Sequence, residues 1–188
     1  MHPLYELEQP VNVLRSGGLI LYPTDSIWGI GCDATNDESV HAVFHLKNRP
    51  YTKPLVVLVS DLDMLRTYVP FVHPRVETLL AYHQRPLTIV YDNARGLAPL
   101  VTASNGTAAI RIPQDRYCQD LVRQFGKPLV ATSAKVNTCP YPAHFGEVTS
   151  DIISGVDYVC KHRQWDKRKN APSVIARMGE DGELEFLR

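Results

Sequence analysis

The chain has 188 residues, enough for one domain with a sizeable core. Hydrophobic residues make up 44% and charged residues 21%, a globular composition that argues against wholesale disorder. The 20 Lys and Arg residues balance the 20 Asp and Glu residues, so the basic excess typical of general nucleic-acid binders is missing. Any nucleic-acid contact would therefore need a local patch.

The first thirteen residues lack the apolar core of a signal peptide. No apolar stretch approaches the length of a membrane span, so no membrane partner is expected. The cysteines lie at positions 32, 118, 139 and 160, without the close pairs of a zinc or dithiol site. These features predict a reduced, cytoplasmic protein.

Apolar runs alternate with helical patterns along the chain. Strands are expected at 19–22, 55–59, 87–91, 109–112, 129–131, 173–176 and 184–187. Helices are expected at 38–46 after a cap at Asn36 or Asp37, from residue 62, at 74–82, and at 117–125 before Gly126. Because the apolar runs are continuous, the strands should be covered on both faces. We expect a single α/β domain over residues 1–188, with one mixed sheet, helices on both faces, and a mobile basic surface loop at 161–170.

The segment 23–31, with the sequence PTDSIWGIG, follows the first expected strand directly. Hydroxyls and backbone amides at the carboxyl end of a strand are where open α/β sheets bind ligands. A tight turn whose Asp and Ser side chains bond to their own backbone explains the same residues equally well. Both explanations remain open from the residues alone.

Three cations, Lys47, Arg49 and Lys53, follow the helix expected at 38–46. Cations at a helix C-terminus complement the helix dipole by up to about 1 kcal/mol, which requires no ligand. Arg49 and Lys53 lie beyond the helix, however, and a proline follows each of them. A fixed cationic cluster beside a strand suits an oligophosphate, and we favour that explanation.

Two more strands carry polar groups. Arg111 lies within an apolar strand and needs an anionic partner, which is either an internal carboxylate or the carboxylate of a ligand. The strand expected at 129–131 runs into two hydroxyls and a cation, Thr132, Ser133 and Lys135. Neither feature identifies its ligand.

Common catalytic motifs are missing from the chain. It contains neither the GxxxxGK[ST] sequence of P-loop enzymes nor the GxSxG elbow of hydrolases. His41 and His45 stand four residues apart, but the intervening residues lack the glutamate of a zinc protease. No protein-bound metal site is therefore expected.

The segments described above, in this order and spacing, resemble the motifs of the YrdC-like family. The family patterns are P-T-(D/E)-T-x-Y-G-L-G, K-x-R-P-x-x-(N/K/S)-P-L, A-(V/I)-R-(I/M)-P, S-A-N, P-S-T-(I/V)-(I/V) and L-L-R. Their counterparts lie at 23–31, 47–55, 109–113, 133–135, 172–175 and 186–188. The resemblance thus extends from about residue 11 to the C-terminus.

The resemblance implies a twisted α/β sheet with a concave, positively charged cavity. It also implies a nucleotidyltransferase, an L-threonylcarbamoyladenylate synthase, which joins L-threonine, bicarbonate or CO₂, and ATP into threonylcarbamoyl-AMP and pyrophosphate. Mg²⁺ would accompany the ATP, and downstream tRNA-modification proteins would transfer the threonylcarbamoyl group to tRNA.

The resemblance further assigns residues to two sets of contacts. On the ATP side it places Lys47, Arg49, Lys53, Thr107, Ser133, Lys135, Tyr141 and Arg188, with Lys47 and Arg49 as the catalytic residues. On the threonine side it places Ser26, Arg111, Ala131 through its backbone, and Ser173. Arg111 is expected to hold the threonine carboxylate rather than an internal one.

Ser26 and Trp28 replace a threonine and a tyrosine of the first pattern, and four further positions depart more strongly from the family. Lys135 replaces an asparagine, Arg85 stands at a glycine, Leu58 occupies the place of a threonine-binding histidine found in some members, and Val174 replaces a threonine. These changes suggest a diverged paralogue of the YciO type. The alternative function is therefore a YciO-like paralogue that binds double-stranded RNA or tRNA and has altered or lost substrate specificity. A plain RNA-binding module would use the loop from Lys161 to Lys169. A third possibility is a partner-binding pseudoenzyme that has lost turnover.

Overall fold

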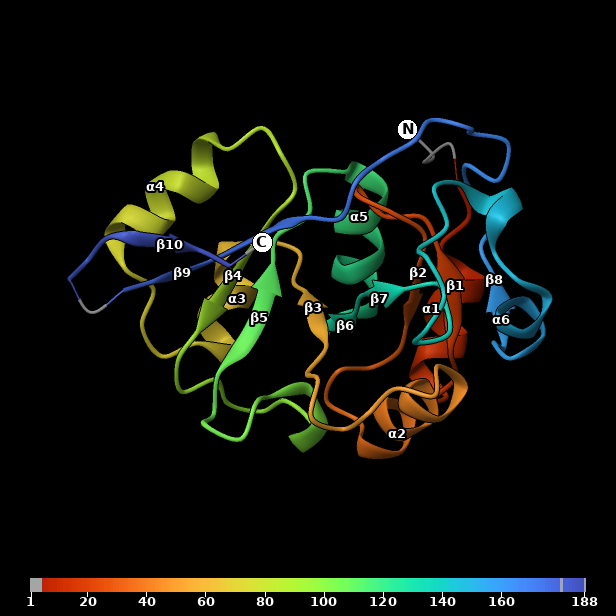
Figure 1. The fold of residues 1–188 in the computed structure, drawn as a ribbon, viewed down its shortest axis with the longest axis horizontal. Coiled ribbons are helices and arrows are strands. Elements are labelled where there is room, and N and C mark those ends of the chain that lie inside the picture. The colour runs from red at the N-terminus through yellow and green to blue at the C-terminus, as the bar shows by residue number, and fades with distance from the viewer. Residues whose placement is uncertain (1–4, 180, 188) are drawn as a thin grey trace.

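The structure is a computed structural model that describes residues 5–179 and 181–187, and its strands form two mixed sheets that lie side by side (Figure 1). The first sheet has the order β7 (Thr132–Ser133), β2 (Gly29–Gly31), β1 (Ile20–Tyr22), β8 (Tyr158–Val159). The second has the order β10 (Leu184–Phe186), β9 (Val174–Met178), β4 (Leu87–Tyr91), β5 (Ala108–Arg111), β3 (Val56–Leu58), β6 (Leu129–Val130). The predicted mixed α/β class is confirmed, but the strands divide between two sheets instead of forming one.

The division into two sheets occurs where β6 passes into β7. These strands are separated only by Ala131, yet β6 pairs with β3 whereas β7 pairs with β2. A bridge between Asp33 and Leu129 adds a second connection at the same place. The residues from 129 to 133 therefore border a space that both sheets share.

Helices cover both faces of the strands, as predicted. The helices are α1 (Glu8–Arg15), α2 (Asp37–Leu46), α3 (Leu62–Tyr68), α4 (Pro74–Tyr82), α5 (Arg116–Phe125) and α6 (Ser150–Ser154). Side chains of α1 and α5 pack with Ile20 and Tyr22 of β1 in one core cluster. Those of α2, α3 and α4 pack in the other cluster, which contains Leu21. Successive residues of β1 thus enter different cores, because side chains alternate across a strand.

The helix ends follow the local signals. Asn36 caps α2 by accepting a hydrogen bond from the Ser39 amide at 2.9 Å, and Gly126 ends α5 in the left-handed region with φ of 84°. Three-residue 3-10 helices occur at Pro99–Val101 and Phe145–Glu147. The sequence patterns missed the helices α1 and α6 and the strands β2, β7 and β8. These strands have only two or three residues, too few to show a hydrophobic period. No helix in the described ranges has the length and apolar character needed to span a bilayer.

The segment 161–170 contains no helix or strand, as expected for a loop. Its inner end nevertheless packs against α5. The ring of His162 stacks on Tyr117 with centroids 4.5 Å apart, and Arg163 forms an ion pair with Asp115 at 2.8 Å. Beyond the loop, the chain crosses from the β8 side to the six-stranded sheet before it enters β9 (Figure 1). This crossing brings residues 172 and 173 to the space between the sheets.

Candidate active site

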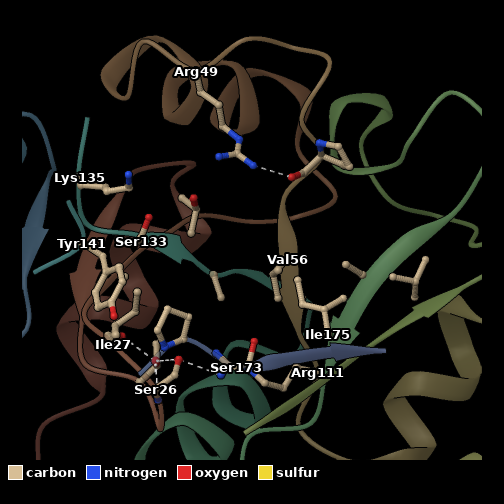
Figure 2. A pocket seen from close by; sticks show the side chains of 18 residues that line it. Ser26, Ile27, Arg49, Val56, Arg111, Ser133, Lys135, Tyr141, Ser173 and Ile175 are labelled. Atoms are coloured by element: carbon tan, nitrogen blue, oxygen red, sulfur yellow. Dashed lines mark hydrogen bonds between the residues drawn. The ribbon is translucent and has the colours of Figure 1, made fainter. Parts of the chain in front are cut away.

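A cavity of about 550 Å³ lies where the two sheets meet, a volume usual for small-molecule sites. Its walls come from β2 and β7 of one sheet and from β3, β4, β5 and β9 of the other. Figure 2 shows charged and hydroxyl side chains at two opposite ends of this cavity, with the apolar side chains of Val56 and Ile175 between them. We name these the Arg49 end (Arg49, Ser133 and Lys135) and the Arg111 end (Ser26, Arg111 and Ser173).

Arg111 has an internal ion-pair partner. Its Nη1 lies 3.0 Å from Oδ1 of Asp25, and both side chains are almost fully buried, with exposed fractions of 4% and 6%. The backbone amide of Gln114 holds the other carboxylate oxygen of Asp25 at 3.2 Å. Arg111 was expected to hold a ligand carboxylate rather than an internal one, but it has an internal carboxylate partner as well, because the turn after β1 brings Asp25 to it. Arg111 still lines the cavity.

A chain of linked hydroxyl groups begins at Arg111. Arg111 Nη1 donates to Oγ of Ser26 at 2.9 Å, and Ser26 Oγ lies 3.0 Å from Oγ1 of Thr24. Thr24 donates in turn to the carbonyl of Ile27 at 2.7 Å. The segment 23–31 is thus both a self-bonded turn and a wall of the cavity. The two explanations left open by its sequence are compatible.

Ser173 and Ala131 complete the residues expected around an amino acid. Ser173 lines the cavity, and its Oγ lies 2.8 Å from Oγ1 of Thr88, a fully buried residue of β4. Ala131 also lines the cavity, but its amide donates to the carbonyl of Val56 at 2.8 Å. That bond keeps the crossover between the two sheets in register.

The Arg49 end presents a guanidinium that the protein has already oriented. Arg49 donates from Nε to the carbonyl of Lys53 at 2.9 Å. It also donates from Nη2 to the carbonyl of Pro54 at 2.9 Å, the bond drawn in Figure 2. Ser133 and Lys135 lie nearby at the cavity wall, and half-exposed Tyr141 adds an aromatic ring. A preorganised arginine with free N–H groups, beside a hydroxyl, suits a phosphate chain.

Lys47 lies behind the cavity wall. Its side chain is only 1% exposed, and its ammonium donates to the carbonyls of Ser133 and Lys135, the latter at 2.7 Å. Burial, and then the neighbouring charges of Arg49 and Lys135, lower the pKa of Lys47 to about 7. The structure thus places this predicted catalytic lysine against backbone oxygens, outside the lining of the cavity.

This lowered pKa predicts a pH dependence of stability. In the unfolded chain the ordinary pKa of 10.5 applies, so between about pH 7 and pH 10.5 the unfolded state binds more protons than the folded state. The free energy of unfolding of the wild type should therefore rise with pH relative to that of Lys47→Met, by roughly 1 kcal/mol per pH unit. Denaturant unfolding of both proteins at pH 7, 8 and 9 measures this difference. Parallel pH profiles would show that Lys47 stays charged in the fold.

Two other predicted ATP-side residues, Lys53 and Thr107, do not line the cavity. The Lys53 side chain is exposed, and its carbonyl serves Arg49 instead. Thr107 faces a neighbouring depression, where its hydroxyl donates to Asn105 at 2.8 Å. Arg188 lies outside the described residues.

Sequence patterns missed several residues that shape the site. The hydroxyl of Thr24 lies within the 23–31 segment, so its sequence could have indicated it. Asp25 and Thr88 act through contacts with distant residues, Arg111 and Ser173 respectively. Among the four stronger departures, at positions 58, 85, 135 and 174, only Lys135 lines the cavity. Leu58 belongs to the core beneath β3, Val174 packs against the other core cluster, and Arg85 is exposed.

The cavity offers cations rather than carboxylates. Arg49, Arg111 and Lys135 line it, and no Asp or Glu of residues 5–179 and 181–187 does so. Within the same ranges, no three His, Cys, Asp or Glu side chains gather in a way that could hold a metal ion. The described lining therefore favours an anionic ligand.

Comparisons with known proteins agree with this fold and these motifs. The Sua5/YciO/YrdC family model, described as telomere recombination, matches residues 12–188. The chain is 31% identical to a threonylcarbamoyl-AMP synthase of Photobacterium profundum, over 79% of this chain and 86% of that protein. It is 34% identical to another of that name from Stenotrophomonas maltophilia, over 69% of this chain and 72% of that protein.

Solved structures share the fold at lower sequence identity. P. abyssi Sua5 complexed with L-threonine superposes with a TM-score of 0.85 at 21% identity, covering 97% of this chain and 53% of that one. The chain thus spans about half the length of that protein. E. coli YciO superposes with a TM-score of 0.81 at 20% identity, covering 97% of this chain and 87% of that one.

Proposed function

Because this chain belongs to the Sua5/YciO/YrdC family, we propose that it is an L-threonylcarbamoyladenylate synthase. The observation that carries the proposal is the single cavity with an arginine at each end, Arg111 beside hydroxyls and Arg49 beside Ser133. One end suits the carboxylate and hydroxyl of an amino acid, and the other suits a triphosphate. The names of the curated relatives support this assignment.

The proposed reaction needs alignment and charge neutralisation more than a covalent nucleophile. The amine of threonine adds to CO₂, forming a carbamate and releasing a proton. A carbamate oxygen then attacks the α-phosphorus of ATP, and the bond to the β-phosphate oxygen breaks to release pyrophosphate. With bicarbonate as the source of CO₂, one water is also released. Cations fixed before the substrates arrive lower the barrier because they need not reorganise during the reaction.

At the Arg111 end, the ligand carboxylate would share the guanidinium with Asp25. Nη1 of Arg111 contacts Asp25 and Ser26, and the guanidinium carries further N–H groups. The hydroxyls of Ser26 and Ser173 would meet the polar groups of threonine. The P. abyssi Sua5 complexed with L-threonine supports an amino acid as the ligand of this fold.

At the Arg49 end, the residues fit a nucleotide that brings its own Mg²⁺. The described lining offers hydroxyls and cations but no carboxylate, so the ion would be held mainly by phosphate oxygens and water. When bound, Mg²⁺ would neutralise phosphate charge. Arg49 would orient the phosphate chain through the N–H groups that Lys53 and Pro54 leave free.

Pyrophosphate release tests the proposal. We expect release that requires threonine, bicarbonate and ATP together, and that is at least tenfold slower with other amino acids, since a site built to bond a hydroxyl rejects analogues that lack it. Release with only a different amino acid would mark a ligase of other specificity. Calorimetric ATP binding without release from any amino acid would contradict the enzyme assignment. We further propose that the product passes to tRNA-modification proteins in the cytoplasm.

A second candidate function is RNA binding by the loop at 161–170. Trp165 is 92% exposed, and the exposed side chains of Lys161, Lys167 and Lys169 lie in the same loop. Exposed aromatic rings stack on bases, and lysines contact phosphates. Titration with a short duplex RNA or with tRNA at several salt concentrations tests this candidate. Steeply salt-dependent RNA binding without ATP binding would favour it over the synthase.

A further inference from the structure

The segment from Ser133 to Cys139 leaves β7 and forms the wall of the Arg49 end without helix or strand structure beyond Ser133. The ammonium groups of two lysines donate hydrogen bonds to its backbone carbonyls. Lys47 donates to the carbonyls of Ser133 and Lys135, and Lys135 donates to those of Asn137 and Cys139. The carbonyl of Lys47 also accepts a hydrogen bond from the Asn137 amide at 2.9 Å. Side chain and backbone thus hold the same segment.

We propose that Lys47 and Lys135 are positioning residues, which shape the nucleotide end by holding the 133–139 segment through its carbonyls, and that neither is primarily a phosphate ligand. The proposal rests on the proposed function in that it takes the Arg49 end as the nucleotide site. It departs from the expectation, based on family resemblance, that both lysines contact ATP directly.

The surroundings of Lys47 support a role that acts through the segment. Its side chain is 1% exposed and does not belong to the cavity lining. The ion pairs found among the described residues include neither Lys47 nor Lys135, and the charged neighbours of Lys47 are the cations Arg49 and Lys135. Backbone carbonyls are therefore the acceptors that compensate these buried or half-buried charges.

The other side of the segment is fixed by β2. Ser133 pairs with Gly29, and the amide of Ala134 donates to the carbonyl of Trp28 at 2.9 Å. Lys47 and Lys135 add hydrogen bonds to the carbonyls of the same segment. Without the two lysines, the carbonyls of this segment would lack hydrogen-bond donors, and the segment would move away from its present position. The Ser133 hydroxyl and Tyr141 would then shift relative to Arg49. The lysine that replaces the family asparagine at position 135 reaches two carbonyls further along this segment.

The chain carries its own reporter for this segment. Cys32, Cys118 and Cys160 are buried, whereas Cys139 is half-buried, so a maleimide applied to the native protein should modify Cys139 first. The experiment compares the rate of Cys139 alkylation in the nucleotide-free wild type, Lys47→Met and Lys135→Met. Cys139→Ser verifies the site of modification. Lys167→Met, which removes an exposed lysine far along the chain, is the matched control.

We expect alkylation about tenfold faster or more in Lys47→Met and in Lys135→Met, since each change removes two hydrogen bonds that hold the segment. Lys167→Met should match the wild type. Wild-type rates in both test variants would overturn the proposal, because a residue that serves only as a phosphate ligand has no effect when phosphate is absent. If Lys47→Met does not fold, the alkylation rate of Lys135→Met alone tests the proposal, because Lys135 is only partly buried.

A kinetic measurement gives a second readout. Lys135→Met should raise the KM for ATP at least about fivefold and leave the KM for threonine within twofold, because the Arg111 end is held by other segments. An equal rise in both KM values would indicate general loosening and would overturn the proposal. The alkylation rates need neither ATP nor turnover, so they test the positioning role even if the synthase assignment fails.

Discussion

Arg111→Met is expected to slow threonine-dependent pyrophosphate release severely and to destabilise the protein. The change leaves the carboxylate of Asp25 buried without its counter-ion, which should lower the free energy of unfolding by about 3–5 kcal/mol. It also removes the cation proposed to hold the ligand carboxylate. Loss of such a contact should lower kcat/KM for threonine on the order of 10²–10³-fold. Denaturant unfolding and the pyrophosphate assay measure the two effects.

A double variant separates the two roles of Arg111. In Asp25→Asn/Arg111→Met the buried charge is gone, so much of the stability should return. Threonine-dependent release should stay as slow as in the single variant, because the guanidinium is still missing. Recovery of activity in the double variant would show that Arg111 serves only to neutralise Asp25. Wild-type stability in the single variant would show that the two side chains do not pair in solution.

Arg49→Met is expected to weaken ATP binding by roughly 10–100-fold, the cost of losing hydrogen bonds to a charged partner. Its guanidinium is held by the carbonyls of Lys53 and Pro54 before any ligand arrives. Little side-chain entropy is therefore lost when the wild type binds ATP. Titration calorimetry with Mg²⁺ and ATP measures the loss. The Kd for threonine should change less than twofold, because Arg111 and Arg49 lie at opposite ends of the cavity (Figure 2).

The control for this prediction is Arg49→Lys. Lysine keeps the positive charge but lacks the planar fork that bonds two carbonyls and a phosphate together. Its loss of ATP affinity should therefore lie between those of the wild type and Arg49→Met. Full retention of affinity in both variants would place the phosphate chain elsewhere in the molecule.

The structure limits how much the departures from the family patterns can alter the substrate. Leu58, Arg85 and Val174 do not line the cavity, so they change the packing or the surface rather than the ligand contacts. Lys135 lines the cavity, but its ammonium lies on two carbonyls of its own segment. The residues at the Arg111 end keep the hydroxyl and arginine groups of the family patterns. A retained amino-acid substrate is consistent with this distribution.

Local patterns predicted much of the secondary structure and the list of candidate residues. The helix α4 has the bounds that its periodicity predicted, and Asn36 and Gly126 end their helices as their chemistry indicates. These features follow from interactions within a few residues, which a single segment contains. The grouping of Arg49, Ser133, Ser26 and Arg111 in one site came from the family resemblance, not from local interactions, and all four line the cavity.

Contacts between distant segments determined the rest. The pairing of Arg111 with Asp25, the burial of Lys47 against Ser133, and the division into two sheets at Ala131 join segments far apart in the chain. Lys47 and Arg49 are equivalent cations in a sequence pattern, yet Lys47 contacts carbonyls 86 and 88 residues away and Arg49 lines the cavity. The charges, the hydroxyl groups and the order of the motifs can be read from the sequence. Which group meets a ligand and which meets the protein itself depends on how the segments pack, because burial assigns each polar group its partner.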